Sequence, residues 1–172
     1  MTMLPAMFAE LLPTRRLATA VLTLALGAAL VGCKEKIGDS CSYNVDCSSL
    51  GDRLCDLASP GGYCTIENCT RESCPDESVC VAFYPVEYLT TPCNPDTEDL
   101  SSDACTSNEA CTRSGFCAPI ASVSRYCMKK CDESSDCRAE YECRRTGLNG
   151  AEPVPPVGQA YTDEVARFCA SS

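Results

Sequence analysis

Cysteine constrains this chain more than any other residue: there are 17 copies in 172 residues, and sixteen of them lie between Cys41 and Cys169. A content near a tenth is typical of secreted chains held by disulfides, whereas cytosolic cysteines more often bind metals or act in redox chemistry. The sequence has no histidine and no C-x-x-C pair, which removes the usual zinc and dithiol redox patterns. We therefore expect a disulfide scaffold with no metal and no cofactor, provided that the chain is exported.

The N-terminal segment, residues 1–32, has the pattern of an export signal. Arg15 and Arg16 form a positive region, and the run from Leu17 to Gly32 is apolar and uncharged. Such a run is short for a transmembrane helix and typical of a signal peptide, with a short membrane anchor as the alternative. The arginine pair also fits twin-arginine export, but the Leu-Ala-Thr that follows it favours general secretion.

The end of this segment, Leu30-Val31-Gly32-Cys33, resembles the bacterial lipobox. The resemblance implies cleavage between Gly32 and Cys33, a diacylglyceryl group on the Cys33 thiol and a palmitate-type chain on the new N-terminus. It also implies a lipoprotein of the outer membrane, because Lys34 rather than aspartate follows the cysteine. The odd number of cysteines agrees with this interpretation. An unpaired cysteine in an exported chain needs an explanation, and lipidation of Cys33 leaves sixteen cysteines, an even number, for disulfides.

The sixteen downstream cysteines fall into two similar sets of eight, which predicts an internal repeat. The sequence around Cys41 and Cys47 matches that around Cys105 and Cys111, and Tyr63-Cys64 matches Tyr126-Cys127. We expect all sixteen to be bridged, four bridges in each set, with a connectivity that sequence cannot choose. The first set is Cys41, Cys47, Cys55, Cys64, Cys69, Cys74, Cys80 and Cys93, and the second is Cys105, Cys111, Cys117, Cys127, Cys131, Cys137, Cys143 and Cys169.

The expected fold class is small and disulfide-rich, mostly irregular with short β-hairpins, and built from two duplicated eight-cysteine domains. The predicted boundaries are a signal peptide at 1–32, a tether and first repeat at 33–95, an acidic linker at 96–102 and a second repeat at 103–172. Strands are expected at 79–84 and 141–145, tight turns at 59–64 and 113–117, an extended loop at 145–161 and a short helix near 162–169.

Catalysis is not expected, because a chain without histidine has no Ser-His-Asp or Cys-His arrangement. Nucleic acid is excluded as a partner by charge, since residues 33–172 carry 12 Lys and Arg against 23 Asp and Glu. The linker acids could serve calcium, but they lack a recognisable loop motif and fit a solvated linker better. A possible binding loop holds Phe83, Tyr84, Tyr88 and Leu89, side chains that a small core could equally bury.

As a whole, the chain resembles the cysteine-rich lipoproteins of myxobacteria, in which a lipobox precedes spaced cysteines such as those in YCTIENCTRESCPDESVC. The resemblance implies a membrane-anchored envelope protein that acts as a surface binding or structural module toward a surface protein or polysaccharide. The alternative is a protease-inhibitor-like disulfide module, with Arg113-Ser114 or Arg71-Glu72 as the exposed loop.

Overall fold

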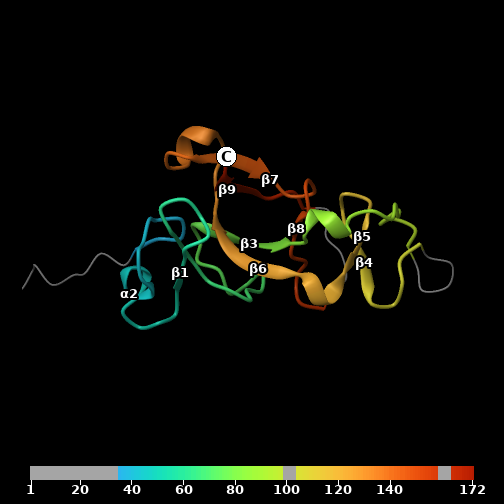
Figure 1. Cartoon of the computed structure of the whole chain (residues 1–172), viewed down its shortest axis with the longest axis horizontal. Coiled ribbons are helices and arrows are strands. Elements are labelled where there is room, and N and C mark those ends of the chain that lie inside the picture. Colours follow the sequence, from blue (N-terminus) through green and yellow to red (C-terminus); the bar gives the residue numbers. More distant parts are fainter. Residues whose placement is uncertain (1–34, 99–103, 159–163) are drawn as a thin grey trace, which may run out of the picture. The chain divides into compact units, whose positions relative to one another are not determined.

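The structure is a computed structural model that describes residues 35–98, 104–158 and 164–172. These described residues form one compact unit. Its regular elements are short (Figure 1): α2 (Asn44–Cys47), β1 (Leu54–Asp56), β2 (Tyr63–Thr65), β3 (Ser78–Phe83), the 3-10 turn η2 (Val86–Tyr88), β4 (Glu109–Cys111), β5 (Cys117–Pro119), η3 (Ile120–Ser122), β6 (Ser124–Lys129), η4 (Ser134–Asp136), β7 (Tyr141–Arg145), β8 (Ala151–Pro153) and β9 (Arg167–Ser171).

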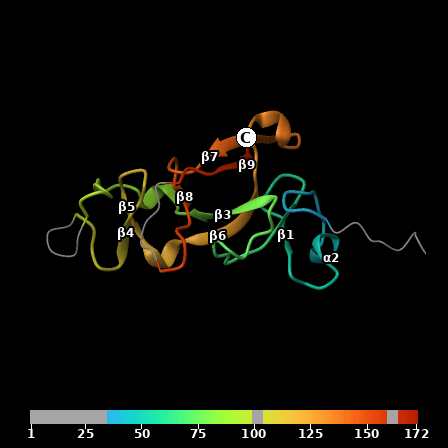
Figure 2. The same ribbon diagram turned by 180° about the vertical axis from the view of Figure 1, so that it is seen from behind.

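All strand pairs between these elements are antiparallel. A three-stranded sheet has the order β6-β3-β8, and the two-stranded pairs are β1-β2, β4-β5 and β7-β9. In Figures 1 and 2, β3 and β6 run side by side, with β1 near one end of this ladder and β4 and β5 near the other. The expected disulfide-rich class with short hairpins is confirmed.

Eight disulfides join the sixteen cysteines from Cys41 to Cys169, and they form a repeating pattern of four cysteines. Within each group the first cysteine bonds the third, and the second bonds the fourth. We call the groups module 1 (Cys41, Cys47, Cys55, Cys64), module 2 (Cys69, Cys74, Cys80, Cys127), module 3 (Cys93, Cys105, Cys111, Cys117) and module 4 (Cys131, Cys137, Cys143, Cys169).

Each module has the same relation between its strands and its bridges. The third and fourth cysteines face each other across an antiparallel pair: Cys55 and Cys64, Cys80 and Cys127, Cys111 and Cys117, Cys143 and Cys169. The loop between the first and second cysteines is therefore bonded at both ends to one antiparallel strand pair. An aromatic residue precedes the fourth cysteine every time, as Tyr63, Tyr126, Phe116 or Phe168.

The expectation of four bridges inside each set of eight is wrong. Cys74 bonds Cys127 and Cys93 bonds Cys111, so two bridges join the sets. The sets are joined because module 3 is inserted within module 2. It lies in the chain between Cys80 on β3 and Cys127 on β6, the third and fourth cysteines of module 2. Cys41 and Cys47 are the first and second cysteines of module 1, whereas their sequence matches Cys105 and Cys111 are the second and third of module 3. Cys64 and Cys127 are both fourth cysteines, which agrees with the tyrosine that precedes each of them.

Local predictions fared unevenly. Strands are confirmed at β3, where Val79, Val81 and Phe83 alternate with small residues, and at β7. The turn before Tyr63 contains Gly61 and Gly62, both at positive φ. The helix expected near 162–169 is wrong, because Arg167–Ser171 is strand β9, paired with β7 across module 4. Part of the loop expected at 145–161 is strand β8, which pairs with β3.

The core is small and rich in cystine. One cluster surrounds Ile37, Tyr63 and Tyr141 together with buried half-cystines of modules 2 and 4. A second cluster forms where Val81 and Phe168 pack between the central sheet and β9. A chain with so little apolar area depends on cross-links for stability, as small domains generally do.

Candidate functional site

The two faces of the central sheet differ chemically, as the alternating residues of β3 show. Val79, Val81 and Phe83 belong to the apolar cluster with Phe168. The alternate residues Ser78, Cys80, Ala82 and Tyr84 point the other way, because side chains alternate along a strand. One hollow lies on this second face beside Ala82 and Tyr84, and another lies beside the start of β3, where Ser78, Val79 and Cys80 line it.

The first hollow has a volume of about 90 Å³ and is built around a cross-strand row. Arg125 on β6 and Glu152 on β8 are both register partners of Ala82 on β3. Register partners on antiparallel strands present their side chains to the same face. The small Ala82 thus separates a basic and an acidic side chain, with Tyr84 at the end of the strand.

Glu152 is the buried charge of this hollow, with only 5% of its surface exposed. Its carboxylate accepts hydrogen bonds from the backbone N–H of Arg113, at 2.9 Å, and of Ser114, at 3.4 Å. Burial raises the pKa of Glu152, and the hydrogen bonds from these two residues oppose the shift only in part. Glu152 therefore joins the hairpin turn of module 3 to the central sheet.

The second hollow, of about 130 Å³, adjoins the first, since Pro153 and Val154 line both. Its charged side chains are Arg71, Lys130 and Glu164. Arg71 forms an ion pair with Glu164, and the Lys130 ammonium donates to the backbone oxygen of Asp76 at 3.0 Å.

Together the two hollows collect positive charge on an acidic protein. Among the described residues, the hollows are lined by four cationic side chains and two carboxylates, Glu152 and Glu164, while the chain as a whole has a net charge of −10; the cations are Arg71, Arg113, Arg125 and Lys130. The sequence pointed to Arg71 and Arg113 only as loop residues and did not point to Arg125 or Lys130, because the four cations come from three separate segments that only the disulfides and the sheet bring together. Ala151-Glu152 was the one local sequence feature of the first hollow, but its flanking glycine and proline are typical of a loop and hid strand β8.

The structure does not bring the four residues of the predicted binding loop into one surface. Phe83 is packed edge-on against Phe168, with ring centroids 5.8 Å apart, and contributes to the core. Tyr84 is half-buried and lines the first hollow, and burial raises the pKa of its hydroxyl. Tyr88 is exposed, whereas Leu89 is half-buried beside Gly150.

The two loops considered for protease inhibition are both held in place. The backbone N–H groups of Arg113 and Ser114 donate to Glu152, and both residues are half-buried. The Arg71 side chain is paired with Glu164. Of these loops, the one at Arg71-Glu72 is the more exposed.

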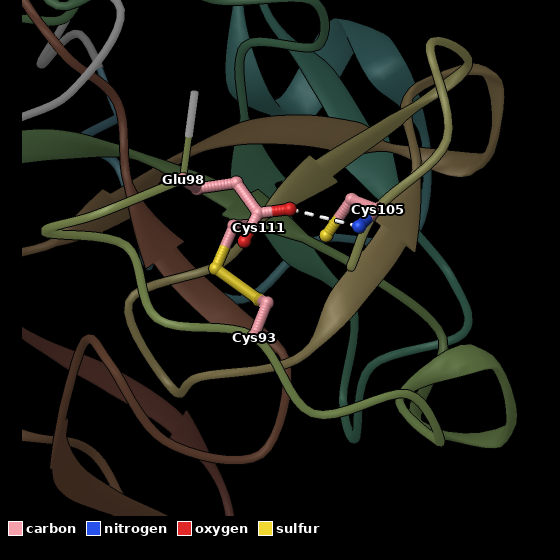
Figure 3. A group of neighbouring side chains, drawn as sticks. All are labelled: Cys93, Glu98, Cys105 and Cys111. Carbon is pink, nitrogen blue, oxygen red and sulfur yellow. Dashed lines mark hydrogen bonds between the residues drawn. A yellow bond between two sulfur atoms is a disulfide. The ribbon is translucent and has the colours of Figure 1, made fainter. Parts of the chain in front are cut away.

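One group of possible metal ligands in the described part of the chain contains a carboxylate: Cys93, Glu98, Cys105 and Cys111. Figure 3 shows the Cys93–Cys111 disulfide beside Glu98, whose carboxylate accepts a hydrogen bond from the Cys105 N–H at 2.8 Å. Cys105 is itself bonded to Cys117. A disulfide sulfur is not the thiolate that metal sites require. These residues therefore hold the fold of module 3 together and do not form a metal site as they stand.

The predicted cleavage and lipidation residues, Gly32 and Cys33, lie outside the described residues, as do two of the acids considered for calcium, Asp99 in the predicted linker and Asp103 just after it. Among the residues that are described, no helix has the length and apolar character needed to cross a membrane. Comparison with known proteins returned no matching family model, no matching curated protein and no matching solved structure.

Proposed function

We propose that this protein is an exported lipoprotein of the bacterial cell envelope, anchored in the outer membrane through lipidated Cys33, and that it binds a partner at the surface without catalysis. The observation that carries the proposal is that all sixteen cysteines from Cys41 to Cys169 pair with one another. None of them needs Cys33 as a partner, which leaves its thiol for the modification that the lipobox-like sequence implies.

The disulfides also support export. Eight bridges form and persist in oxidising compartments, whereas cytosolic thiols are kept reduced. Two or three acyl chains hold a protein firmly at a membrane, at roughly 0.8 kcal/mol for each buried CH₂ group, so no transmembrane helix is required. The acidic surface of the scaffold keeps such a protein soluble beyond the lipid.

The first test is intact mass spectrometry of the protein from native membranes, before and after reduction. The proposal predicts a chain that begins at Cys33, carries lipid, and gains sixteen reactive thiols only on reduction. The matched variant Cys33→Ser should leave the membrane fraction with its disulfides intact. A chain that keeps residues 1–32, or one whose Cys33 is a free thiol, would contradict the anchor.

A protease-inhibitor module is the second candidate, and one observation favours it. The exposed Arg71-Glu72 bond lies between Cys69 and Cys74, whose bridges to Cys80 and Cys127 fix both ends of the loop. Rigid loops bind with little loss of conformational entropy. Arg71→Ala should abolish inhibition of trypsin-like proteases, and failure of the unaltered protein to inhibit a panel of them would reject this candidate.

A further inference from the structure

We propose that module 1 rests directly on the membrane, with its exposed apolar side chains in the lipid headgroup region. The inference rests on the proposed lipidation of Cys33 and specifies what the anchored protein touches, which is a bilayer surface. Two observations support it: the way in which the chain enters module 1, and the apolar side chains that this module leaves exposed.

The chain is fixed to the fold within a few residues of Cys33. The Glu35 backbone oxygen accepts a hydrogen bond from the buried guanidinium of Arg53. The Ile37 side chain is fully buried in the first core cluster, and the Gly38 N–H donates to the backbone oxygen of the fourth cysteine of module 1 at 2.9 Å. The contacts of the folded module therefore begin at Glu35.

This short link keeps module 1 at the membrane surface. Two peptide units join Cys33 to Glu35, and they span at most about 7 Å when fully extended. The headgroup layer is about 5–8 Å thick on each side of the hydrocarbon core. When acyl chains on Cys33 lie in that core, Glu35 stays close to the headgroups, and the module that begins there contacts them.

Module 1 also exposes the side chains that such a contact requires. Among the described residues, five large apolar side chains are more than two-thirds exposed, and four of them lie between the first and last cysteines of module 1: Tyr43, Val45, Leu50 and Leu57. Tyrosine and aliphatic side chains are the kinds that interfacial segments place at the boundary between headgroups and acyl chains. Their concentration in the module next to the anchor favours lipid as the occupant.

These apolar residues lie at the end of the unit where the described chain begins. In Figures 1 and 2, α2 and the first described residues, drawn in blue, lie at the same end of the central ladder of β3 and β6. Val45 is on α2, Tyr43 caps its N-terminus, and Leu50 is in the loop that follows. Both bridges of module 1 tie this stretch to β1 and β2. One membrane surface can therefore contact both the entry of the chain and these side chains.

Charge does not supply this contact. Residues 33–65 carry five Asp and Glu against three Lys and Arg, so anionic headgroups do not attract the module. The acyl chains and the apolar side chains remain as its source. The contact should therefore form on zwitterionic lipid and persist at high salt.

The test uses tryptophan as a reporter, because the chain contains none. Val45→Trp and Leu50→Trp place it on module 1, and Val157→Trp is the matched control, since Val157 is 80% exposed against 73% for Val45. Each full-length lipidated protein is reconstituted into phosphatidylcholine vesicles, with or without acyl chains brominated near the headgroup. Bromine should quench the module 1 reporters by about half or more and Val157→Trp by less than about a tenth.

Three outcomes would overturn this inference. The first is equal quenching of Val157→Trp, or no quenching of either module 1 reporter. The second is a blue-shifted emission of these reporters without quenching, which would show that a second copy of the protein, and not lipid, covers module 1. The third is quenching that requires anionic lipid and disappears at high salt, because an apolar contact needs neither condition.

Circular dichroism and counting of free thiols show whether each variant keeps its fold, and the two module 1 reporters are independent of each other. The mass of the same samples reports lipidation of Cys33. A lipidated, folded protein without quenching would refute the membrane contact of module 1 and leave the anchor standing. An unlipidated chain would refute the anchor and this inference with it.

Discussion

Cys80 and Cys127 face each other across β3 and β6, yet each is bonded to a different cysteine, Cys69 and Cys74 respectively. The same holds for the facing pairs of the other modules. Facing residues on antiparallel strands keep their Cβ atoms about 4.5–5.5 Å apart, whereas a disulfide needs about 3.8 Å. Each antiparallel strand pair therefore presents two cysteines on one face, and the loop between the first and second cysteines of the module is bonded to both.

The crossing of bridges between the two predicted repeats gives the first prediction. A non-reducing peptide map should contain Cys74 linked to Cys127 and Cys93 linked to Cys111. Removing the Cys74–Cys127 bridge by double serine substitution should destabilise more than removing Cys69–Cys80, because the sequence separations are 53 and 11. Loop-closure entropy suggests about 4 and about 3 kcal/mol, to be read from denaturant midpoints. Bridges confined to residues 41–93 and 105–169 would contradict the four-module pattern.

Gly62 permits the closest approach in module 1. A Cβ at this position would lie 2.0 Å from the backbone oxygen of Cys41, and its φ is +69°. We expect Gly62→Ala to destabilise by more than about 4 kcal/mol, seen as loss of fully oxidised protein. Gly51→Ala is the control, since Gly51 has a φ of +74° with nothing within 4 Å, and it should cost only about 1–2 kcal/mol for its left-handed backbone. Equal effects would show that the contact is irrelevant.

Tyr63 should make stability fall at alkaline pH. Its hydroxyl accepts from the Lys129 N–H at 2.9 Å, and burial raises its pKa from 10.0 to about 12. Because the folded protein holds this proton more tightly than the unfolded chain, the contribution is complete below pH 10 and is lost between about 10 and about 12.

Tyr63→Phe should cost about 1–3 kcal/mol at pH 7, because the Lys129 N–H loses its acceptor, and it should flatten the decline in stability above pH 10. Urea midpoints measured from pH 7 to pH 11 test both effects. Tyr88→Phe, at an exposed position, should change neither. An unchanged alkaline slope in Tyr63→Phe would assign the decline to other groups.

Arg138 links module 4 to the β1–β2 turn of module 1. Its guanidinium stacks 4.3 Å from the Tyr141 ring centroid and donates to the backbone oxygens of Pro60, at 2.8 Å, and Gly62. Arg138→Lys keeps the charge but loses the planar fork, so we expect a loss of about 1–2 kcal/mol in thermal unfolding. Arg144→Lys, on the exposed side of β7, should be near neutral. A neutral Arg138→Lys would mean that charge alone suffices.

How far the sequence predicts the fold depends on the range of the interaction. Strand β3 and the turn at Gly61 and Gly62 were predicted because local residue preference and tertiary structure agree there. The helix predicted near 162–169 overlaps the start of β9, and the strand was missed because its partner β7 is distant in sequence. The pairing of Cys74 was not predicted, because an entire module separates it from Cys127. The first hollow was not predicted, because Arg125 and Glu152 meet only through Ala82.

The position of module 3 within module 2 has a consequence for the order in which the chain matures. A chain that crosses a membrane from its N-terminus presents Cys74 long before Cys127, with Cys80, Cys93, Cys105, Cys111 and Cys117 appearing in between. Module 1 can close as soon as Cys64 emerges, but Cys74 must wait through the completion of another unit and avoid five earlier thiols. In an exported chain, correct pairing of Cys74 should therefore depend on reshuffling of earlier disulfides, and loss of a disulfide isomerase should lower the yield of the Cys74–Cys127 bridge more than that of module 1.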